Sequence, residues 1–244
     1  MKADNLDQIY SKLLWDLHMV PDFVVPAGAS CDGHRCNGFR EMLGYQFKLT
    51  DPTQNQITRN NARGFKLDYA KAFFNYVTTG ELGGVLDNKN AHKYLVEFEG
   101  RNTQYYPRIA KQLPGVIKEL TNDKHSRRAV ITILEAGDQL VLEGKFKGET
   151  NIEYPCTNTV TFAIRDDKLH LVVNMRSESA AMVLPYDVYN FTNIQMLVLS
   201  KMQEVYPELG LGTYTHQMAS FHYYDNEEPL VKNILNEYGL ITKD

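Results

Sequence analysis

A short polar turn, RDDK at 165–168, does most to limit the fold, because it joins two apolar strand-like runs, TVTFAI (159–164) and LHLVVNM (169–175). Runs of β-branched and aromatic residues separated by a few polar turn residues predict a β-hairpin. Two further strand-like segments, AVITIL (129–134) and GTYTHQMASFHYY (212–224), lie on either side of this hairpin. We therefore expect a β-sheet at the centre of the fold.

Segments with apolar residues at helical spacing surround these strands. The expected helices cover 4–18, 67–79, 108–120 and 188–206, with a short helix after residue 224. The helix at 188–206 is apolar nearly all round, so we expect it to be buried. Another short strand is expected within 42–52, after a loop-rich connection at 21–40. Clustered strands with helices at both ends predict an α+β fold, with helices packed on a mostly antiparallel or mixed sheet.

The chain of 244 residues is expected to form a single domain, 1–244, because no linker-like or low-complexity tract divides it. Its net charge is −4 and its longest basic run is the pair Arg127 and Arg128, which argues against binding to a nucleic-acid polymer. No stretch approaches the roughly 18 apolar residues of a membrane span. We expect a cytoplasmic protein, or one of the host cytoplasm if the chain is of phage origin.

The three cysteines do not suggest a disulfide framework. In CDGHRC, residues Cys31, His34 and Cys36 are close enough in sequence to share one metal ion. They are only three ligands at an unusual spacing, and no second cysteine pair follows. We therefore expect a surface loop there and no metal site.

Polar side chains interrupt apolar segments at places where folding alone would not require them. Arg176 and Ser177 directly follow a strand, where a guanidinium and a hydroxyl can hold a phosphate. Asp187 stands at the start of an apolar helix, where either an N-terminal cap or a functional role accounts for it. His222 and Tyr224 alternate along a strand and so share one face.

Cys156 follows a proline at the start of an alternating apolar run. A lone cysteine in such a place is more often a small buried hydrophobe than a nucleophile. A nearby cation such as Arg176 would lower the pKa of the thiol and raise its thiolate fraction. Both interpretations of Cys156 stay open on this residue alone.

Taken in order, seven segments resemble the thymidylate synthase family and, within it, the deoxycytidylate hydroxymethylases: YYPRI, SRRAVI, PCTNTVTFAIRDDKL, VVNMRS, LPYDVYNFT, GTYTH and SFHYY. The resemblance runs from about Tyr105 to Tyr224. Before residue 100 only LGYQFKLTDP and the helix at 67–79 match, and they match loosely. The resemblance implies a thymidylate synthase-like α+β fold, with a large mixed β-sheet and helices packed on one of its faces, and a homodimer formed through the sheet.

By this resemblance the catalytic residues are Cys156, Tyr105 and Asp187, and the substrate-binding residues are Arg35, Arg127, Arg128, Arg176, Ser177, Asp187, His222 and Tyr224. Cys156 would add to C6 of a pyrimidine ring, which makes C5 nucleophilic, and Tyr105 would assist removal of the C5 proton. Arg127 and Arg128 would reach the phosphate from the second subunit. His222 and Tyr224 would bind the sugar hydroxyl. Arg35 is either the phosphate-binding arginine of a loop or a solvent-facing side chain.

Among these residues, Asp187 is the most informative about which pyrimidine base the protein would bind. Thymidylate synthases have an asparagine at this position, which pairs with uracil, whereas the cytidylate hydroxymethylases have aspartate. A carboxyl group accepts a hydrogen bond from N4 of cytosine, and in its protonated form it also donates to N3. Thr157, where synthases usually have histidine, agrees with the hydroxymethylase branch. The resemblance thus implies a pyrimidine nucleoside monophosphate as substrate, with dCMP favoured.

The resemblance fails at other positions. Phe73 stands where the family has its general acid/base glutamate, Ser179 where it has an aspartate, and Val183 where a glycine packs against folate. Trp15 is the only tryptophan, so the tryptophans of the folate pocket have no counterpart. The resemblance implies 5,10-methylenetetrahydrofolate as cofactor, although Ser179 and Val183 differ from the family's residues at the folate site.

Three hypotheses follow. The first is a hydroxymethylase in which Cys156 activates a cytidylate, folate supplies the carbon and water completes the product. The second keeps the addition to C6 but uses another donor, or no folate. The third is a nucleotide-binding subunit without catalysis, for which Cys156→Ser would leave affinity unchanged, whereas in an enzyme it would abolish turnover.

Overall fold

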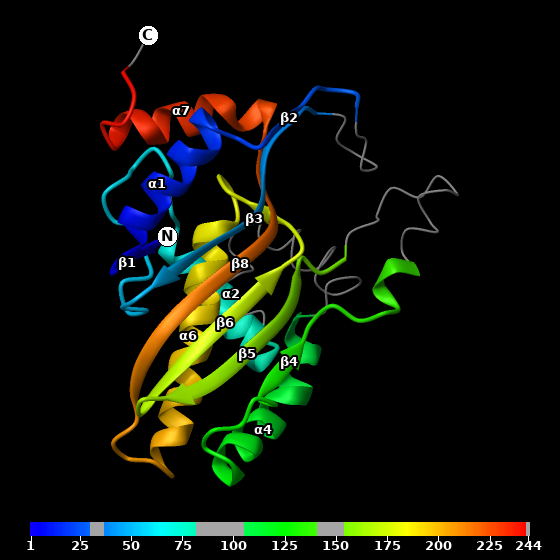
Figure 1. The fold of residues 1–244 in the computed structure, drawn as a ribbon, viewed down its shortest axis with the longest axis vertical. Helices are drawn as coiled ribbons and strands as arrows, with labels where there is room; N and C mark the ends of the chain where they lie inside the picture. The colour runs from blue at the N-terminus through cyan, green and yellow to red at the C-terminus, as the bar shows by residue number, and fades with distance from the viewer. Residues whose placement is uncertain (30–36, 82–104, 141–153, 243–244) are drawn as a thin grey trace.

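A computed structural model describes residues 1–29, 37–81, 105–140 and 154–242 (Figure 1). The predicted hairpin is confirmed: β5 (Thr157–Arg165) and β6 (Lys168–Met175) pair antiparallel. The two residues between them, Asp166 and Asp167, have φ values of 49° and 52°. Positive φ at both central residues is the turn geometry that matches the right-handed twist of paired strands.

The hairpin belongs to an eight-stranded mixed sheet with the order β1-β3-β8-β6-β5-β4, in which β2 also pairs with β3 and β7 with β8. Its remaining strands are β1 (Lys2–Ala3), β2 (Phe23–Val25), β3 (Phe39–Leu49), β4 (Val130–Thr132), β7 (Glu178–Ser179) and β8 (Gly210–Tyr224). The pairs β6–β8, β7–β8 and β1–β3 are parallel, and the others are antiparallel. The mixed sheet expected from the sequence is confirmed.

β3 is longer than the short strand expected within 42–52. Its first residues, 39–41, pair with β2 on one side and with β8 on the other. Backbone hydrogen bonds on both sides hold this segment extended, although its side chains show no strict alternation. The loop-rich connection predicted at 21–40 therefore contains a strand and the start of another.

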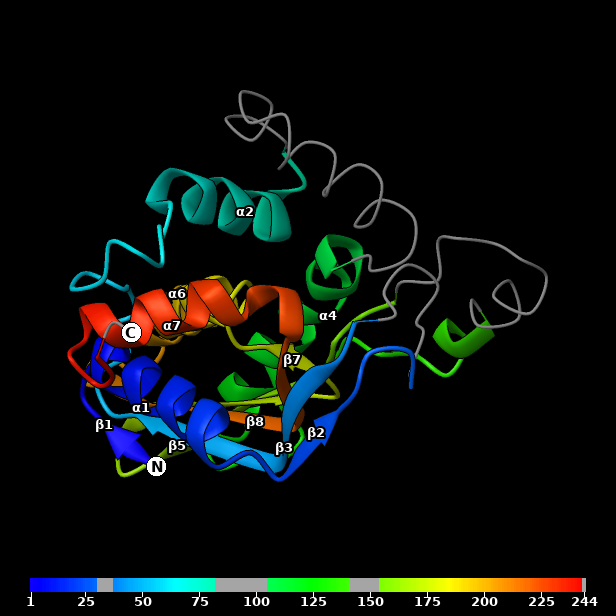
Figure 2. The ribbon, with the colours of Figure 1, turned by 90° about the horizontal axis from the view of Figure 1, so that it is seen from above.

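The described helices are α1 (Leu6–Met19), α2 (Leu67–Thr79), α4 (Tyr105–Asn122), α6 (Leu184–Gln203) and α7 (Glu228–Glu237), with short 3₁₀ turns η2 (Asp138–Leu140) and η3 (Asp225–Glu227). Figure 2 shows α2, α4 and α6 on the same side of the sheet. α2 ends at Gly80, as predicted, in a left-handed conformation. None of the described helices is long and apolar enough to cross a membrane.

The helix expected at 188–206 begins earlier, at Leu184, because Pro185 is tolerated in a first helical turn. It is largely buried, as predicted, and many of its residues line the core. This earlier start places Asp187 inside the first turn of α6 rather than at its cap. The position of Asp187 is decisive for the candidate site.

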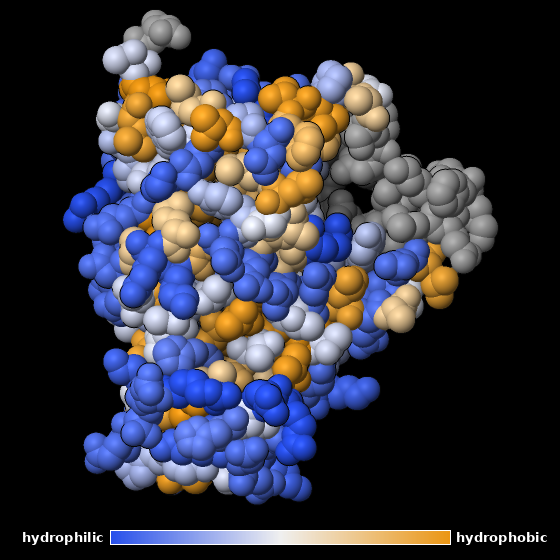
Figure 3. All heavy atoms as spheres, viewed as in Figure 1, coloured by the Kyte–Doolittle hydropathy of each residue, from blue (hydrophilic) through white to orange (hydrophobic). Residues whose placement is uncertain are grey.

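The two faces of the sheet differ in composition. The side facing the core carries fully buried apolar residues such as Val160, Phe162, Leu171, Val173 and Tyr214. Residues that alternate with them stay partly or largely exposed, and they are mostly small or polar: Gln46, Lys48, Thr159, Thr161, Val172, Asn174, Thr215 and Gln217. Figure 3 shows hydrophilic and hydrophobic side chains mixed over the visible surface.

Candidate active site

Cys156 and Arg176 meet at one end of the sheet. The register pairs Thr157 with Met175 and Met175 with Met218, so β5 begins where β6 ends and beside the second half of β8. The backbone N–H of Arg176 donates to the carbonyl of Cys156 over 2.8 Å. The Cys156 side chain is half-buried there. The two residues predicted to act together are neighbours in space.

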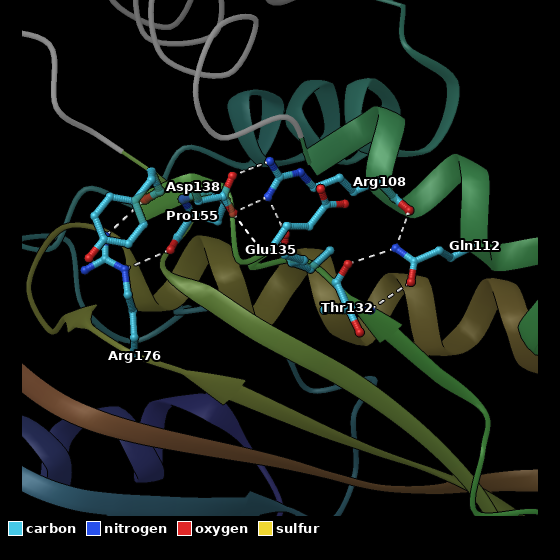
Figure 4. Close-up of polar contacts among 9 residues, drawn as sticks. Arg108, Gln112, Thr132, Glu135, Asp138, Pro155 and Arg176 are labelled. Atoms are coloured by element: carbon cyan, nitrogen blue, oxygen red, sulfur yellow. Dashed lines mark hydrogen bonds and ion pairs between the residues drawn. The ribbon is translucent and has the colours of Figure 1, made fainter. Parts of the chain in front are cut away.

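The Arg176 guanidinium lies against the segment that leads into Cys156 (Figure 4). Its Nε donates to the carbonyl of Pro155 over 2.9 Å and its Nη2 to that of Tyr154 over 3.0 Å. The group also covers the Tyr154 ring at 4.0 Å from its centre. These two bonds leave other N–H donors of the guanidinium for an oxyanion. Ser177 follows directly and is half-buried.

Tyr105, the first residue of α4, contacts the residue after the cysteine. Its phenolic oxygen lies 3.0 Å from Oγ1 of Thr157 and accepts from the Thr157 N–H over 3.3 Å. Thr157 itself is fully buried. The start of α4 is therefore fixed beside Cys156, and the Tyr105 hydroxyl is positioned to take part in chemistry there.

Asp187 is not a helix cap. The N-cap of α6 is Val183, and no side chain forms a capping hydrogen bond there. The Asp187 carboxyl is half-buried and instead shares a hydrogen bond with Glu178, the first residue of β7. The cap interpretation was wrong because it depended on a helix that begins at or after residue 187.

Glu178 lies behind Asp187 and is only 2% exposed. Its Oε2 is 3.1 Å from Nε2 of His216, whose Nδ1 is 2.5 Å from the hydroxyl of Tyr214. The His216 ring stacks on Phe47, with 5.3 Å between ring centres. We call Glu178, Asp187, Tyr214 and His216 the carboxyl cluster. In this cluster a chain of contacts connects the half-buried Asp187 to the buried side chains of His216 and Tyr214 on β8.

Burial shifts the pKa values of the carboxyl cluster. It raises the pKa of Glu178 to about 8, with the hydrogen bond to Asp187 acting in the opposite direction. Burial, and then the neighbouring Glu178, hold the pKa of Asp187 well above its usual range. Burial lowers the pKa of His216 to about 4, so this imidazole is neutral at pH 7. The carboxyl groups of Glu178 and Asp187 are therefore expected to stay protonated at neutral pH.

Sequence reasoning missed Glu178 and His216. Adjacent residues of an extended segment point to opposite sides, and Glu178 points into the core, where it meets Asp187. His216 is fully buried and lies within hydrogen-bonding distance of Glu178. The available signal was a glutamate two residues after Arg176 in VVNMRSESAAM, and a histidine in the segment GTYTHQM, which has no Asp, Glu, Lys or Arg.

His222 and Tyr224 lie together as predicted, with 5.1 Å between their ring centres. The carbonyl of His222 accepts from the N–H of Ala180 over 2.8 Å, and His222 pairs with Ser179. Strand β7 therefore connects this pair to Arg176 and Ser177, which precede it directly.

Arg127 and Arg128 are not brought to Cys156 within one chain. Arg127 and Arg128 are exposed near the end of α4 opposite Tyr105, and a helix of 18 residues is about 27 Å long. Arg128 pairs with Glu119 of its own chain over 2.9 Å. Arg35 and the segment with Cys31, His34 and Cys36 lie outside the described residues.

Phe73 lies on α2 and stacks against Tyr69, with 6.2 Å between ring centres. Tyr69 in turn meets Tyr186 edge-on. The position that the resemblance assigns to a proton-transferring glutamate is thus part of an aromatic cluster. Within the residues that the structure describes, no three His, Cys, Asp or Glu side chains are arranged to hold a metal ion.

The family model for thymidylate synthase matches residues 50–239. The chain belongs to the thymidylate synthase family. Members of this family bind a pyrimidine nucleotide and normally use methylenetetrahydrofolate. The match includes α2, α4 and every residue of the carboxyl cluster.

Several relatives are similar to this family member over much of their length. A protein of Methanococcoides burtonii named "Putative thymidylate synthase" is 27% identical over 211 residues, which is 85% of this chain and 84% of the relative. A protein of Methanosarcina barkeri with the same name is 24% identical, covering 82% and 81%. The "Thymidylate synthase" of Symbiobacterium thermophilum is 28% identical over 53% of this chain and 42% of its own.

Proposed function

We propose that this protein transfers a one-carbon unit to C5 of a pyrimidine nucleoside monophosphate, and that its reaction is the 5-hydroxymethylation of a cytidylate, with dCMP favoured. Family membership supports C5 transfer in general. The observation that supports a cytidylate as substrate is the Asp187 carboxyl. It does not cap helix α6, and it interacts with the carboxyl of Glu178. A carboxyl that keeps its proton can accept from N4 and donate to N3 of cytosine.

Each step of the activation falls to a residue of this chain. The Cys156 thiolate forms a bond to C6, and the electron pair of the C5–C6 double bond moves towards N3. Asp187 donates a hydrogen bond, and then its proton, to N3 as that charge develops. Tyr105 assists removal of the C5 proton once the new carbon is attached. Expulsion of Cys156 from C6 restores the aromatic ring.

Arg176 and Ser177 bind the phosphate in this proposal, and Arg35 adds a loop contact. Phosphate binding beside Cys156 orients C6 towards the sulfur, and the Arg176 charge favours the thiolate. His222 and Tyr224 bind the sugar hydroxyl from the far side of β7. Their separation of 5.1 Å allows both rings to contact one sugar.

The residues at the positions that the resemblance assigns to folate do not fit it well. Ser179 offers a hydroxyl in place of a carboxylate, and Val183, 37% exposed, places a branched side chain where the family has glycine. We therefore derive no step through folate. This mismatch favours a second candidate function, in which the addition to C6 is kept and the carbon comes from another donor.

A homodimer through the outer face of the sheet is part of the proposal. Arg127 and Arg128 lie beyond the end of α4 opposite Tyr105, too far to reach a phosphate at Arg176 of the same chain. On the outer face, Gln217 bonds to Gln46 and Asn174 to Thr159, each over 3.1 Å, so part of its polar surface is already paired. Each such pair lowers the desolvation cost of packing this face against a second copy.

The direct test substitutes the proposed nucleophile. We expect Cys156→Ser to bind dCMP with the affinity of the wild type and to lose all release of tritium from C5-labelled nucleotide. Cys31→Ser removes another thiol and serves as the matched control, which should keep turnover. Equal affinity together with unchanged turnover in Cys156→Ser would overturn the covalent mechanism. Binding without turnover in the wild type would support a nucleotide-binding protein instead.

A further inference from the structure

The two carboxyl groups of Glu178 and Asp187 are in hydrogen-bonding contact, and no described cation compensates them. The ionisable groups that act on this pair are His216 and Tyr214, both on β8. His216 is neutral at pH 7 because burial lowers its pKa to about 4, and burial keeps the Tyr214 hydroxyl protonated. Two carboxylates in contact cannot both be ionised in such surroundings, so the pair holds at least one proton.

The direction of the hydrogen bonds depends on the tautomer of the imidazole. A neutral imidazole has one donor nitrogen and one acceptor nitrogen. In the tautomer with its proton on Nε2, the Tyr214 hydroxyl donates to Nδ1 of His216 and the Nε2–H group donates to Oε2 of Glu178. Stacking on Phe47 holds the ring in this orientation. In this tautomer Glu178 accepts a hydrogen bond from His216, so its own carboxyl proton can be donated to Asp187.

We propose that Glu178 is a positioning residue that donates its carboxyl proton as a hydrogen bond to Asp187, that each of the two carboxyl groups carries one proton at neutral pH, and that the His216 and Tyr214 pair orients Glu178 for this role. The neighbouring carboxyl keeps Asp187 protonated and therefore able to donate to the pyrimidine ring. Glu178 itself, 2% exposed, never touches the nucleotide. This inference rests on the proposed function of Asp187 and adds the group that sets its protonation.

The proton count balances during the addition to C6. As the Cys156 sulfur bonds to C6, the Asp187 proton moves to N3 and the Asp187 carboxyl becomes an anion. Glu178 keeps its own proton and donates it as a hydrogen bond to that anion, which stabilises the charge in a buried site. When the sulfur leaves and the ring is restored, the proton returns from N3 to Asp187.

Glu178→Gln tests this role through the pH profile. The amide can still donate to Asp187, but it removes the second carboxyl, whose proximity raises the pKa of Asp187. Asp187 should then lose its proton at lower pH, and the alkaline limb of kcat should move down by about one pH unit or more. Activity should recover on acidification. A purely structural role would lower kcat at every pH and leave the limb in place.

Infrared spectra of the protein without nucleotide test the inference independently of activity. We expect a protonated-carboxyl C=O band at pH 7 in the wild type, and its loss or reduction in Glu178→Gln and in Asp187→Asn. Thr192→Val is the control, because Thr192 is a fully buried polar residue of the same helix whose hydroxyl bonds to Asn55 over 2.8 Å. It should lower stability and leave the band unchanged.

The outcomes separate the two proposals. If the wild type shows the carboxyl band but no reaction at C5 of any nucleotide, the protonated carboxyl pair is supported and the proposed function is overturned. If the wild type reacts at C5 but shows no such band at pH 7, the protonated carboxyl pair alone is overturned. If Glu178→Gln does not fold, the wild-type band and the spectrum of Asp187→Asn still decide the matter.

Discussion

Single residues carry the chemistry, and Tyr105 gives the clearest test at this scale. Its hydroxyl contacts both Oγ1 and N–H of Thr157, next to Cys156. We predict that Tyr105→Phe keeps nucleotide affinity within about twofold and slows C5 tritium release by about 100-fold, the usual size of a general acid/base contribution. Steady-state kinetics and calorimetric titration with dCMP measure the two effects. Equal losses in affinity and rate would assign Tyr105 to binding instead.

Much of the candidate site could be predicted at this scale, and the missing part has a physical cause. The adjacency of Cys156 and Arg176 followed from residue types at the ends of two strands. Whether Asp187 caps a helix depends on where α6 begins, which Pro185 decides. The contact between Glu178 and Asp187 joins separate elements, so no local pattern contains it.

At the scale of elements, the packing of α2 against α4 depends on Gly80. Its φ is 78°, and a Cβ there would lie 2.5 Å from the ring of Tyr106 in α4. We predict that Gly80→Ala lowers the free energy of unfolding by about 2 kcal/mol or more, from backbone strain and this clash.

Gly64→Ala is the matched control for Gly80. Gly64 has φ 61° and no atom within 4 Å of an added Cβ, so only the strain of about 1 kcal/mol should appear. Urea denaturation of both variants measures the difference. Equal losses in the two variants would contradict the predicted contact with Tyr106.

The start of α4 is fixed by a buried ion pair. Arg108 and Asp138 are joined by hydrogen bonds of 2.6 Å, and their side chains are 9% and 8% exposed (Figure 4). Arg108→Met should cost about 3–5 kcal/mol because it leaves the Asp138 charge buried without its partner. Asp138→Asn, which removes that charge, should restore part of the loss in the double variant.

The pH dependence of this pair has a definite sign. Burial raises the pKa of Asp138, but hydrogen bonds from Arg108 and Glu135 outweigh it and lower the pKa overall. The stabilisation is therefore present at neutral pH and is lost as the pH falls below about 4. Thermal melts of Arg108→Met between pH 3 and 7 should lack this acid-dependent loss; an unchanged profile would contradict the assignment.

Elements were more predictable than their ends. The hairpin of β5 and β6, the end of α2 at Gly80 and the buried α6 followed from turn residues and apolar spacing. β2 and the first part of β3 did not, because their pairing is a backbone interaction between distant segments. α4 begins at Tyr105 rather than at 108, since Pro107 is tolerated in a first turn.

For the whole molecule, the separation of Arg127 and Arg128 from Cys156 predicts that each complete site needs two chains. Cys156→Ser and Arg127→Glu/Arg128→Glu should each be inactive alone as dimers. Mixing and reassociating them should restore activity at one site of each mixed dimer. Sedimentation verifies the oligomeric state. A monomer with full activity, or no recovery after mixing, would contradict a shared site.

The most direct test of the central claim is tritium release from C5-labelled dCMP, with dUMP and CMP in parallel, each with and without methylenetetrahydrofolate. We predict release from dCMP well above release from dUMP, and its loss in Cys156→Ser. Dependence on folate would identify the hydroxymethylase, and release without folate would identify the enzyme with another donor. Release from dUMP alone, or from no nucleotide that binds, would contradict the assignment of Asp187 as the residue that recognises cytosine in an active enzyme.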